Sequence, residues 1–344
     1  MNNKEIINIR LSDNGSKVEI LDQTKLPNET KYIKLSGAEE LFEAIHTLRV
    51  RGAPAIGIFA AYALYVLARQ IKADSFDVFN TELLKLSAYL DSSRPTAVNL
   101  SAQLRRMEKL AALSEGKPIP QILEAMRNEA DKIYDEDVEM NRAISEYGLT
   151  LIKDGCGIMT QCNAGPIATS RYGTALGPIL MGYERGMKLA AYICETRPLL
   201  QGARLTAYEL DNAGVDSTLI CDNMASIVMS EGKVDAVFAG CDRIARNGDV
   251  ANKVGTSSLA ILAKHYGIPF YIFGPSTTID MDCPTGADIE IELRNPEEIK
   301  EMFYEKPMAP PNVKCYNPAF DVTANDLITA IITEKGIFRN GLNP

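Results

Sequence analysis

The sequence predicts an α/β protein in which a Rossmann-like doubly wound parallel sheet domain follows a smaller, mainly helical N-terminal domain with a short β element. Two observations carry this prediction. From about Gly155 onward, short β-rich runs alternate with helix-length segments, a pattern typical of parallel strands with helices on both faces. Before that point, apolar residues recur mostly at helical intervals.

The N-terminal part is predicted to start with two strands and to continue as helices. The β-type runs are Lys17–Leu21 and Thr30–Leu35. Helical spacing then predicts helices over 38–47, 55–68, 76–90, 97–113 and 119–147. The apolar run Ala55 to Ala68 is shorter than the roughly 20 residues that cross a membrane, so we expect a buried helix.

A break at Ser114–Pro118 is the best linker candidate, because Gly and Pro interrupt the helical pattern there. It predicts a mainly helical domain over 1–118 and a catalytic α/β domain over 119–344, joined through a long helical segment at 119–150. Strands of the second domain are expected at 157–161, 190–194, 217–221, 236–239 and 269–273. No GxGxxG or GxxxxGK[ST] motif follows any of them, which argues against a nucleotide cofactor.

The charge balance excludes broad classes of partner. The 344 residues include 36 Lys and Arg against 45 Asp and Glu, a formal net charge of −9. Such a chain has no general attraction for nucleic acid or an anionic membrane, so any bound phosphate must be held by a few placed cations and amides. Seven cysteines without CxxC spacing indicate a reducing, cytoplasmic compartment, and two histidines leave few ligands for a metal site.

Polar residues come directly after several predicted strands. In open α/β sheets, ligands bind outside these carboxyl ends of the strands. Cys162 could act as a nucleophile or an acid, or be an inert strand-end cysteine. Arg197 and Gln201 could bind a sugar or phosphate, the alternative being helix capping and a surface ion pair. Asp222 stands where an N-cap would be, and capping suffices to explain it.

The stretch from Gly240 to Thr256 carries the strongest chemical signal. Asp242 follows a very apolar strand, so we expect a partly desolvated carboxyl with a raised pKa, suited to proton transfer. A salt bridge with Arg243 or Arg246 is the alternative. Asn252 and Lys253 come near the start of the next helix, where an ammonium and free backbone N–H groups could hold a phosphate together.

The N-terminal domain offers two more cationic positions. Arg51 and Gly52 precede the apolar helix, with Pro54 in its first turn, and form an anion cradle without a Walker sequence. Arg94 stands before Pro95, which keeps it out of a helix. Either arginine alone fits a surface position, but together with Lys253 they could neutralise one phosphomonoester.

Eight motifs resemble the methylthioribose-1-phosphate isomerase family, in the superfamily that includes the regulatory subunits of the exchange factor for translation initiation factor two. They occur in order over most of the chain and are RGAPAIG at 51–57, SRPT at 93–96, CNAG at 162–165, YGTALG at 172–177, ETRPLLQGARLTA at 195–207, DRI at 242–244, NGDVANK at 247–253 and GIPFY at 267–271.

The resemblance implies isomerisation of the aldose 5-methylthioribose 1-phosphate to the ketose 5-methylthioribulose 1-phosphate, a step of methionine salvage and so of amino-acid biosynthesis, without metal or nucleotide. It assigns Asp242 as the catalytic acid/base and Cys162 as the second catalytic residue. The substrate-binding residues that it implies are Arg51, Gly52, Ala53, Arg94, Gln201, Asn252 and Lys253. The family's enzymes are homodimers, and the cations come from both sides of the linker, so the expected site is the cleft between the domains.

Three departures from the family pattern concern Cys241, the stretch 165–167 and the stretch 290–296. The catalytic pair is retained, so the reaction class stands. The substituent at C5 stays open: 5-deoxyribose 1-phosphate, or both sugars, fit the same residues. A non-catalytic regulatory subunit would need neither Cys162 nor Asp242, and ribose 1,5-bisphosphate would require a second phosphate site that no extra basic cluster supplies.

Overall fold

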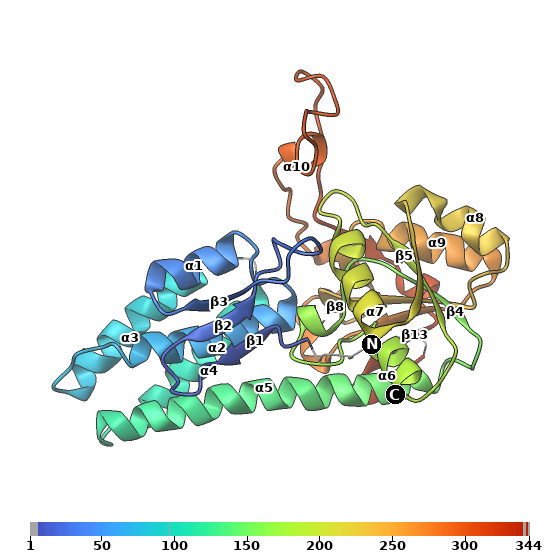
Figure 1. Cartoon of the computed structure of the whole chain (residues 1–344). Coiled ribbons are helices and arrows are strands. Elements are labelled where there is room, and N and C mark those ends of the chain that lie inside the picture. The colour runs from blue at the N-terminus through green and yellow to red at the C-terminus, as the bar shows by residue number, and fades with distance from the viewer. Residues whose placement is uncertain (1–5, 96, 340–341, 343–344) are drawn as a thin grey trace. The chain divides into compact units, whose positions relative to one another are not determined.

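The computed structural model describes residues 6–95, 97–339 and 342 and divides into two compact units (Figure 1). Among these residues, the N-terminal unit comprises 6–139 together with Pro166–Arg171, and the sheet unit comprises Met140–Gly165 and the chain from Tyr172 onward. Thr96, part of the SRPT motif, lies outside the described residues.

The N-terminal unit contains a small antiparallel sheet of order β1-β2-β3, followed by helices. Its elements are β1 (Ile9–Leu11), β2 (Val18–Leu21), β3 (Tyr32–Leu35), α1 (Ala38–His46), α2 (Ala53–Ala68), α3 (Phe76–Asp91), α4 (Val98–Ala112) and the first part of α5 (Ile119–Leu149). Residues 114–118 form the turn between α4 and α5. The sequence-based domain boundary at 118/119 stays a prediction.

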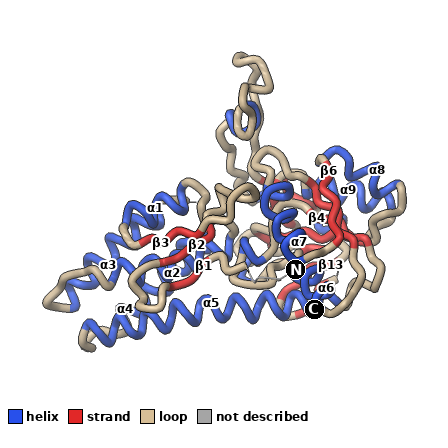
Figure 2. The backbone as a smooth tube through the Cα atoms, in the orientation of Figure 1, coloured by secondary structure: helices blue, strands red, loops and turns tan. Residues whose placement is uncertain are grey.

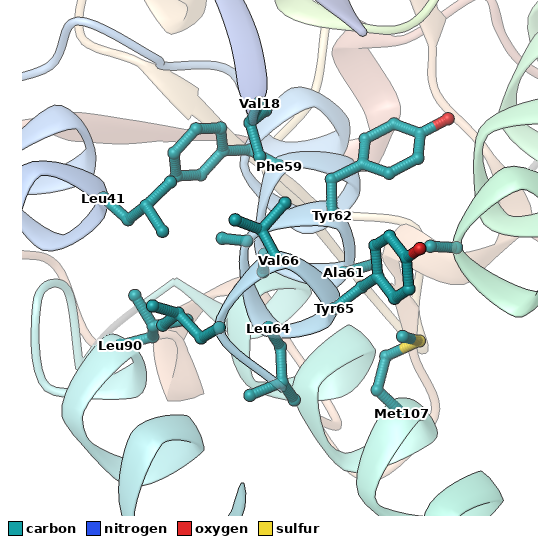
Figure 3. Close-up of a cluster of buried hydrophobic side chains, with 14 of the residues drawn as sticks. Val18, Leu41, Phe59, Ala61, Tyr62, Leu64, Tyr65, Val66, Leu90 and Met107 are labelled. Atoms are coloured by element: carbon teal, nitrogen blue, oxygen red, sulfur yellow. The ribbon is translucent and has the colours of Figure 1, made fainter. Parts of the chain in front are cut away.

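Helix α2 is the centre of the N-terminal core. Every residue from Ala55 to Ala68 is buried, because the helix is apolar on all sides and has neighbours on all sides. Figure 3 shows its side chains, among them Phe59 and Leu64, pointing in different directions into the cluster that includes Val18, Leu41 and other residues of this unit. The apolar run is therefore a core helix, as predicted.

The sheet unit is built on a large central sheet, whose strands are red in Figure 2. The sheet has seven strands in the order β14-β13-β10-β7-β4-β5-β6, and among them only the β13–β14 pair is antiparallel. The strands are β4 (Gly157–Thr160), β5 (Ala190–Cys194), β6 (Asp216–Ile220), β7 (Ala236–Gly240), β10 (Phe270–Phe273), β13 (Ala330–Thr333) and β14 (Gly336–Phe338). The helices are α6 (Gly177–Glu184), α7 (Ala207–Ala213), α8 (Ala225–Ser230) and α9 (Thr256–Tyr266).

Helices cover both faces of this sheet. Along β7, Phe238 packs in one buried cluster with residues of α5, α6 and α7, while Val237 and Ala239 pack in another with residues of α8 and α9. A strand buried on both faces has an uninterrupted apolar sequence, which is what residues 236–239 show. The doubly wound α/β fold and the helical N-terminal part predicted from the sequence are confirmed, and the five strands predicted in this unit begin and end within one residue of the observed strands.

A smaller sheet of order β11-β8-β9-β12 is inserted into the sheet unit. Its strands are β8 (Arg243–Ala245), β9 (Val250–Lys253), β11 (Ile279–Asp280) and β12 (Phe320–Thr323). The segment around the short helix α10 (Glu297–Lys300), orange in Figure 1, extends away from the sheets. A bilayer could not be crossed by any of the helices in the described part of the chain.

Candidate active site

The two residues predicted to be catalytic follow the two strands that flank the switch point of the main sheet. In chain order the six parallel strands are arranged 3-2-1-4-5-6, so connections after β4 turn toward β5 and those after β7 turn toward β10. Cys162 lies in the loop after β4, and Asp242 follows β7. Ligands bind outside the carboxyl ends of strands at such a point.

Two threonines hold the backbone of Cys162. Its N–H donates to Thr196 Oγ1 at 2.8 Å, and its carbonyl oxygen accepts from Thr206 Oγ1 at 2.5 Å. Cys162 has a φ of 59°, a left-handed conformation that costs a non-glycine residue free energy and persists where neighbours fix it. The side chain is half-buried at the end of the sheet.

A buried carboxyl group continues this network behind Cys162. Asn163 donates from Nδ2 to Thr206 Oγ1 at 3.2 Å and also to Glu209 Oε2. Glu209, in α7, is 2% exposed. The sequence motifs contain Thr206 and Thr196 but gave no reason to assign them a role, because both bonds join residues more than 30 positions apart.

Asp242 is exposed, which corrects the expectation of a partly desolvated carboxyl. The strand before it is fully buried, but Asp242 lies just past its end, at the start of the β8–β9 hairpin, where its N–H donates to the Ala251 carbonyl oxygen at 2.9 Å. The hairpin register pairs Arg243 with Ala251, so Asp242 and Asn252 are each next in the chain to a paired residue. Arg243, the nearest cation in sequence, pairs with Asp280 at 3.5 Å.

Lys253 is a buried lysine on β9. It is 7% exposed, and its Nζ lies 5.1 Å from the centroid of the Phe320 ring, which faces it across the β9–β12 pair. Its neighbour Asn252 is 5% exposed and donates from Nδ2 to Thr256 Oγ1 at 3.0 Å.

Two backbone N–H groups at the start of α9, which the sequence suggested were free for a phosphate, already have an acceptor within the chain. Asp321 accepts the N–H of Gly255 at 2.7 Å and that of Ser257 at 3.1 Å, so the chain's own carboxylate occupies these amides. Burial raises the pKa of Asp321, although the backbone hydrogen bonds oppose that shift. The sequence could not show this cap, because Asp321 lies 66 residues after Gly255.

The loop after β5 carries Gln201 and is fixed by Asp222. Gln201 is 4% exposed, and within the described residues no donor reaches its Oε1. The carboxylate of Asp222 accepts backbone N–H groups of Thr196 and Arg197. Asp222 therefore binds a neighbouring loop, and the N-cap predicted from its position is wrong: the short 3₁₀ turn that it begins has no side-chain cap.

Arg197 itself turns toward the α10 segment. Its Nη2 donates to the Ile299 carbonyl oxygen at 2.7 Å, and the guanidinium lies 5.4 Å from the centroid of the Tyr304 ring. These contacts give Arg197 a structural role.

Two further cysteines, Cys194 and Cys241, lie near the ends of β5 and β7. Burial raises the pKa of Cys194 to about 12, and that of Cys241 to about 12. Both therefore stay thiols at neutral pH, and the departure from the family pattern at Cys241 adds a neutral group.

A cavity of about 320 Å³ lies beside the strand-end loops of the sheet unit. Its lining residues are Gln161, Cys194, Asp222, Asn223, Gly255, Ser258, Leu259 and Leu262. Gln161 immediately precedes Cys162 and donates from Nε2 to the carbonyl oxygens of Lys253 and Val254, at 3.1 and 2.8 Å. Gln161 thus ties the loop after β4 to the end of β9.

The remaining predicted residues lie in the N-terminal unit. Gly52 has a φ of 104°, and a Cβ there would lie 2.5 Å from the Ala168 carbonyl oxygen, so only glycine fits this close approach. Gln23 donates from Nε2 to the carbonyl oxygens of Arg51 and Ile167, at 3.3 and 3.2 Å. These bonds hold the start of α2 against the segment Pro166–Arg171, which follows the Cys162 loop in the chain.

Arg51, Ala53 and Arg94 are half-buried, Arg94 in the turn after α3. The candidate residues are therefore divided between the units: Arg51, Gly52, Ala53 and Arg94 belong to the N-terminal unit, and Cys162, Gln201, Asp242, Asn252 and Lys253 to the sheet unit.

Comparisons with known proteins identify the family. The model of the initiation factor 2 subunit family matches residues 49–340. A protein of Symbiobacterium thermophilum named methylthioribose-1-phosphate isomerase is 60% identical over 336 residues, which cover 98% of this chain and 94% of that protein. The chain belongs to the methylthioribose-1-phosphate isomerase family. It is an enzyme of the sugar 1-phosphate isomerase type, as its sequence motifs implied.

Relatives in this isomerase family carry two substrate names. A Parabacteroides distasonis protein, 57% identical over 96% of this chain and 98% of its own length, is named methylthioribose-1-phosphate isomerase. A Petrotoga mobilis protein, 55% identical over 96% of this chain and 95% of its own length, is named 5-deoxyribose 1-phosphate isomerase.

Solved structures confirm the fold. That of 5-methylthioribose 1-phosphate isomerase from Pyrococcus horikoshii is 41% identical, covers 98% of this chain and 94% of that chain, and superposes with a TM-score of 0.92. A structure described as translation initiation factor eIF-2B, subunit delta, from A. fulgidus is 42% identical in sequence and has a TM-score of 0.89. The match covers 97% of this chain and 96% of that chain.

Proposed function

We propose that this protein converts 5-methylthioribose 1-phosphate into 5-methylthioribulose 1-phosphate, a step of methionine salvage, in the cytoplasm and as a homodimer. The observation that carries the proposal is the relative of that name, which is 60% identical over 98% of the chain. The positions of Cys162 and Asp242 after the two strands at the switch point support it, because ligands bind there in this fold.

The reaction needs an acid and a base but no external oxidant. The phosphate on the anomeric oxygen prevents the simple ring opening of a free aldose. A proton is therefore delivered to the ring oxygen as its bond to C1 breaks, one hydrogen moves from C2 to C1, and the C2 hydroxyl loses its proton to become the ketone. Asp242 is the acid/base of this scheme and Cys162 the second catalytic residue.

The other candidate residues bind the sugar phosphate. Arg51, Arg94 and Lys253 supply positive charge for the phosphate, with Gly52 and Ala53 allowing close approach of the backbone. The buried Lys253, held against Phe320, is preorganised for an anion.

Gln201 and Asn252 bind sugar hydroxyls in this scheme. The unmatched Gln201 Oε1 is a suitable acceptor for a sugar hydroxyl, since a buried carbonyl oxygen gains about 1–3 kcal/mol when it finds a donor.

5-Deoxyribose 1-phosphate is the second candidate substrate. The relatives of that name are 55% and 53% identical, only slightly less than those named for the methylthio sugar. Both sugars present the same phosphate and hydroxyl groups to the proposed residues and differ only at C5.

The experiment that tests the function compares three substrates. Purified protein is given 5-methylthioribose 1-phosphate, 5-deoxyribose 1-phosphate and ribose 1,5-bisphosphate, and ketose formation is followed. We expect the highest kcat/KM with the methylthio sugar and almost none with the bisphosphate. A higher kcat/KM with 5-deoxyribose 1-phosphate would make that sugar the main substrate instead. If none reacts, the proposed reaction is wrong, and a non-catalytic role like that of the initiation factor branch is the alternative to test. Light scattering after size exclusion tests the dimer.

A further inference from the structure

A chain of hydrogen bonds links the loops after β4, β5 and β6, and it begins at Asp222, which has no part in the proposed chemistry. The residue follows β6, and its two carboxylate oxygens each accept one N–H of the loop after β5. The Thr196 N–H donates to Oδ1 at 2.7 Å, and the Arg197 N–H donates to Oδ2 at 2.7 Å. Both bonds are charge-assisted and therefore stronger than neutral ones.

Thr196 transmits this constraint to Cys162. Its Oγ1 accepts the Cys162 N–H at 2.8 Å and donates to the Cys194 carbonyl oxygen at 3.0 Å. Thr196 is 1% exposed and has a φ of 64°, a conformation that β-branched residues rarely adopt. The hydrogen bond from the Thr196 N–H to Asp222 is one of the interactions that can offset this unfavourable conformation.

The same loop determines where Gln201 lies. Leu200 donates its N–H to the Thr196 carbonyl oxygen at 2.8 Å, and Ala203 donates to that of Glu195 at 3.3 Å. Gly202 packs directly on β5: a Cβ there would lie 1.8 Å from the Cys194 carbonyl oxygen. A shift of Thr196 and Arg197 would therefore displace Gln201 together with Cys162.

We propose that Asp222 is a positioning residue that fixes Cys162 and Gln201 by holding Thr196 and Arg197. For its kinetic consequence this inference rests on the proposed isomerase function. Its structural content, the placement of Cys162, does not depend on which sugar reacts.

The first test compares Asp222→Ala and Asp222→Asn with wild type. The alanine variant leaves two N–H groups without their acceptor, and we expect kcat to fall about 10- to 100-fold and KM to rise severalfold. The asparagine variant keeps the size and one acceptor oxygen, so we expect partial rescue.

The chain provides a matched control in Asp235, whose Oδ2 accepts the Gly157 N–H at 2.8 Å at the opposite end of β4. We expect Asp235→Asn to lower the melting temperature about as much as Asp222→Asn does, with kcat unchanged. An equal loss of kcat in Asp235→Asn would overturn the proposal, because it would show a general effect of destabilisation.

The second test does not use the reaction. The rate at which iodoacetamide alkylates Cys162 is measured by peptide mass spectrometry in the folded proteins. We expect the rate to increase at least about threefold in Asp222→Ala, since the loop is freed, and to be unchanged in Asp235→Asn. Equal rates in wild type and Asp222→Ala would overturn the inference. If no sugar reacts with wild type but alkylation changes, the proposed function fails and the positioning role holds.

The route through Thr196 is tested by a double-mutant cycle. Thr196→Val removes the hydroxyl and keeps the shape. If Asp222 acts through Thr196, the effects of Thr196→Val and Asp222→Ala on Cys162 alkylation are not additive. Additive effects would contradict this route.

Discussion

The core around α2 and the strand-end loops of the main sheet both contain buried side chains, but these side chains differ in polarity. From Ala55 to Ala68 the buried side chains are apolar apart from the tyrosine hydroxyls. At the carboxyl ends of β4, β5 and β9, the buried residues include Gln161, Asn163, Thr196, Gln201 and Lys253. A polar group stays buried only where hydrogen bonds or a ligand compensate for lost water. The first region is therefore held together by apolar packing, whereas the second depends on its hydrogen bonds and is where we propose that the substrate binds.

Among substitutions that test this difference, the largest effect on turnover is expected at Asp242 and Cys162, the proposed catalytic pair. Asp242→Asn and Cys162→Ala should each lower turnover about 10²- to 10⁴-fold, because each removes a group that acts on the reacting atoms. Initial rates of ketose formation measure this. Since Asp242 is exposed, its variant should unfold at nearly the wild-type denaturant concentration. Full activity in Asp242→Asn would refute the mechanism.

The opposite behaviour is expected in the core of the N-terminal unit. Leu64→Ala should lower the free energy of unfolding by about 2–5 kcal/mol, because it opens a cavity at a fully buried site. Urea unfolding measures this, and kcat of the folded fraction should not change. Leu113→Ala is the control, since that side chain is 74% exposed and should give a change within about 0.5 kcal/mol. A loss of kcat in the folded fraction of Leu64→Ala would show that the core around α2 also affects catalysis, contrary to this comparison.

A smaller effect is expected for the buried cation. Lys253→Met keeps an unbranched side chain beside Phe320 but removes the charge. It should raise KM about 10- to 100-fold, because one charge-assisted hydrogen bond to the phosphate is lost. Lys264→Met serves as the control, because Lys264 is exposed and pairs with Asp326 at 2.8 Å. Equal KM values in wild type and Lys253→Met would remove Lys253 from the substrate site.

The smallest effect concerns the start of α1. Glu40 Oε2 accepts the N–H groups of Ser36 and Gly37, at 3.1 and 3.0 Å, and these bonds hold the pKa of Glu40 below its usual value. The resulting stabilisation is present above the unfolded pKa and is lost as the pH falls through the lowered folded pKa. Because Glu40 is exposed, Glu40→Gln should destabilise by at most about 0.5 kcal/mol at pH 7 and not at all in acid. Urea midpoints at both pH values check this, and a difference that persists in acid would contradict the assignment.

Local patterns were enough to predict the helices of the N-terminal part and five strands of the main sheet. They did not predict β1, β13, β14 or the smaller sheet, nor the contacts between the ends of the elements. The helix at 55–68 and the strand at 236–239 follow from continuous apolar sequence, and the structure confirms both. Asp242 can be singled out because it comes shortly after such a strand, whereas the residues alone leave the role of Cys162 open and the family resemblance assigns it. The partners of Asp222 could not be predicted, because a carboxylate at a strand end forms the same sequence pattern whether it caps its own turn or binds a neighbouring loop.

The pair of loops after β5 and β6 does contain a signal that could have suggested this contact. Cys194 pairs with Ile220 in parallel register, so the residues that follow these two strands are neighbours. The Asp242 environment needed more than sequence: an apolar strand indicates burial up to its last residue and gives no information about the residue beyond it.

The carboxylate of Asp321 at the start of α9 affects which anions can bind there. A helix N-terminus attracts any anion that reaches it, including inorganic phosphate and the phosphates of abundant nucleotides. Here the protein supplies a carboxylate of its own, which accepts two of the N–H groups at this end of the helix. We therefore expect discrimination among cellular phosphates to depend on the side chains of the proposed substrate site.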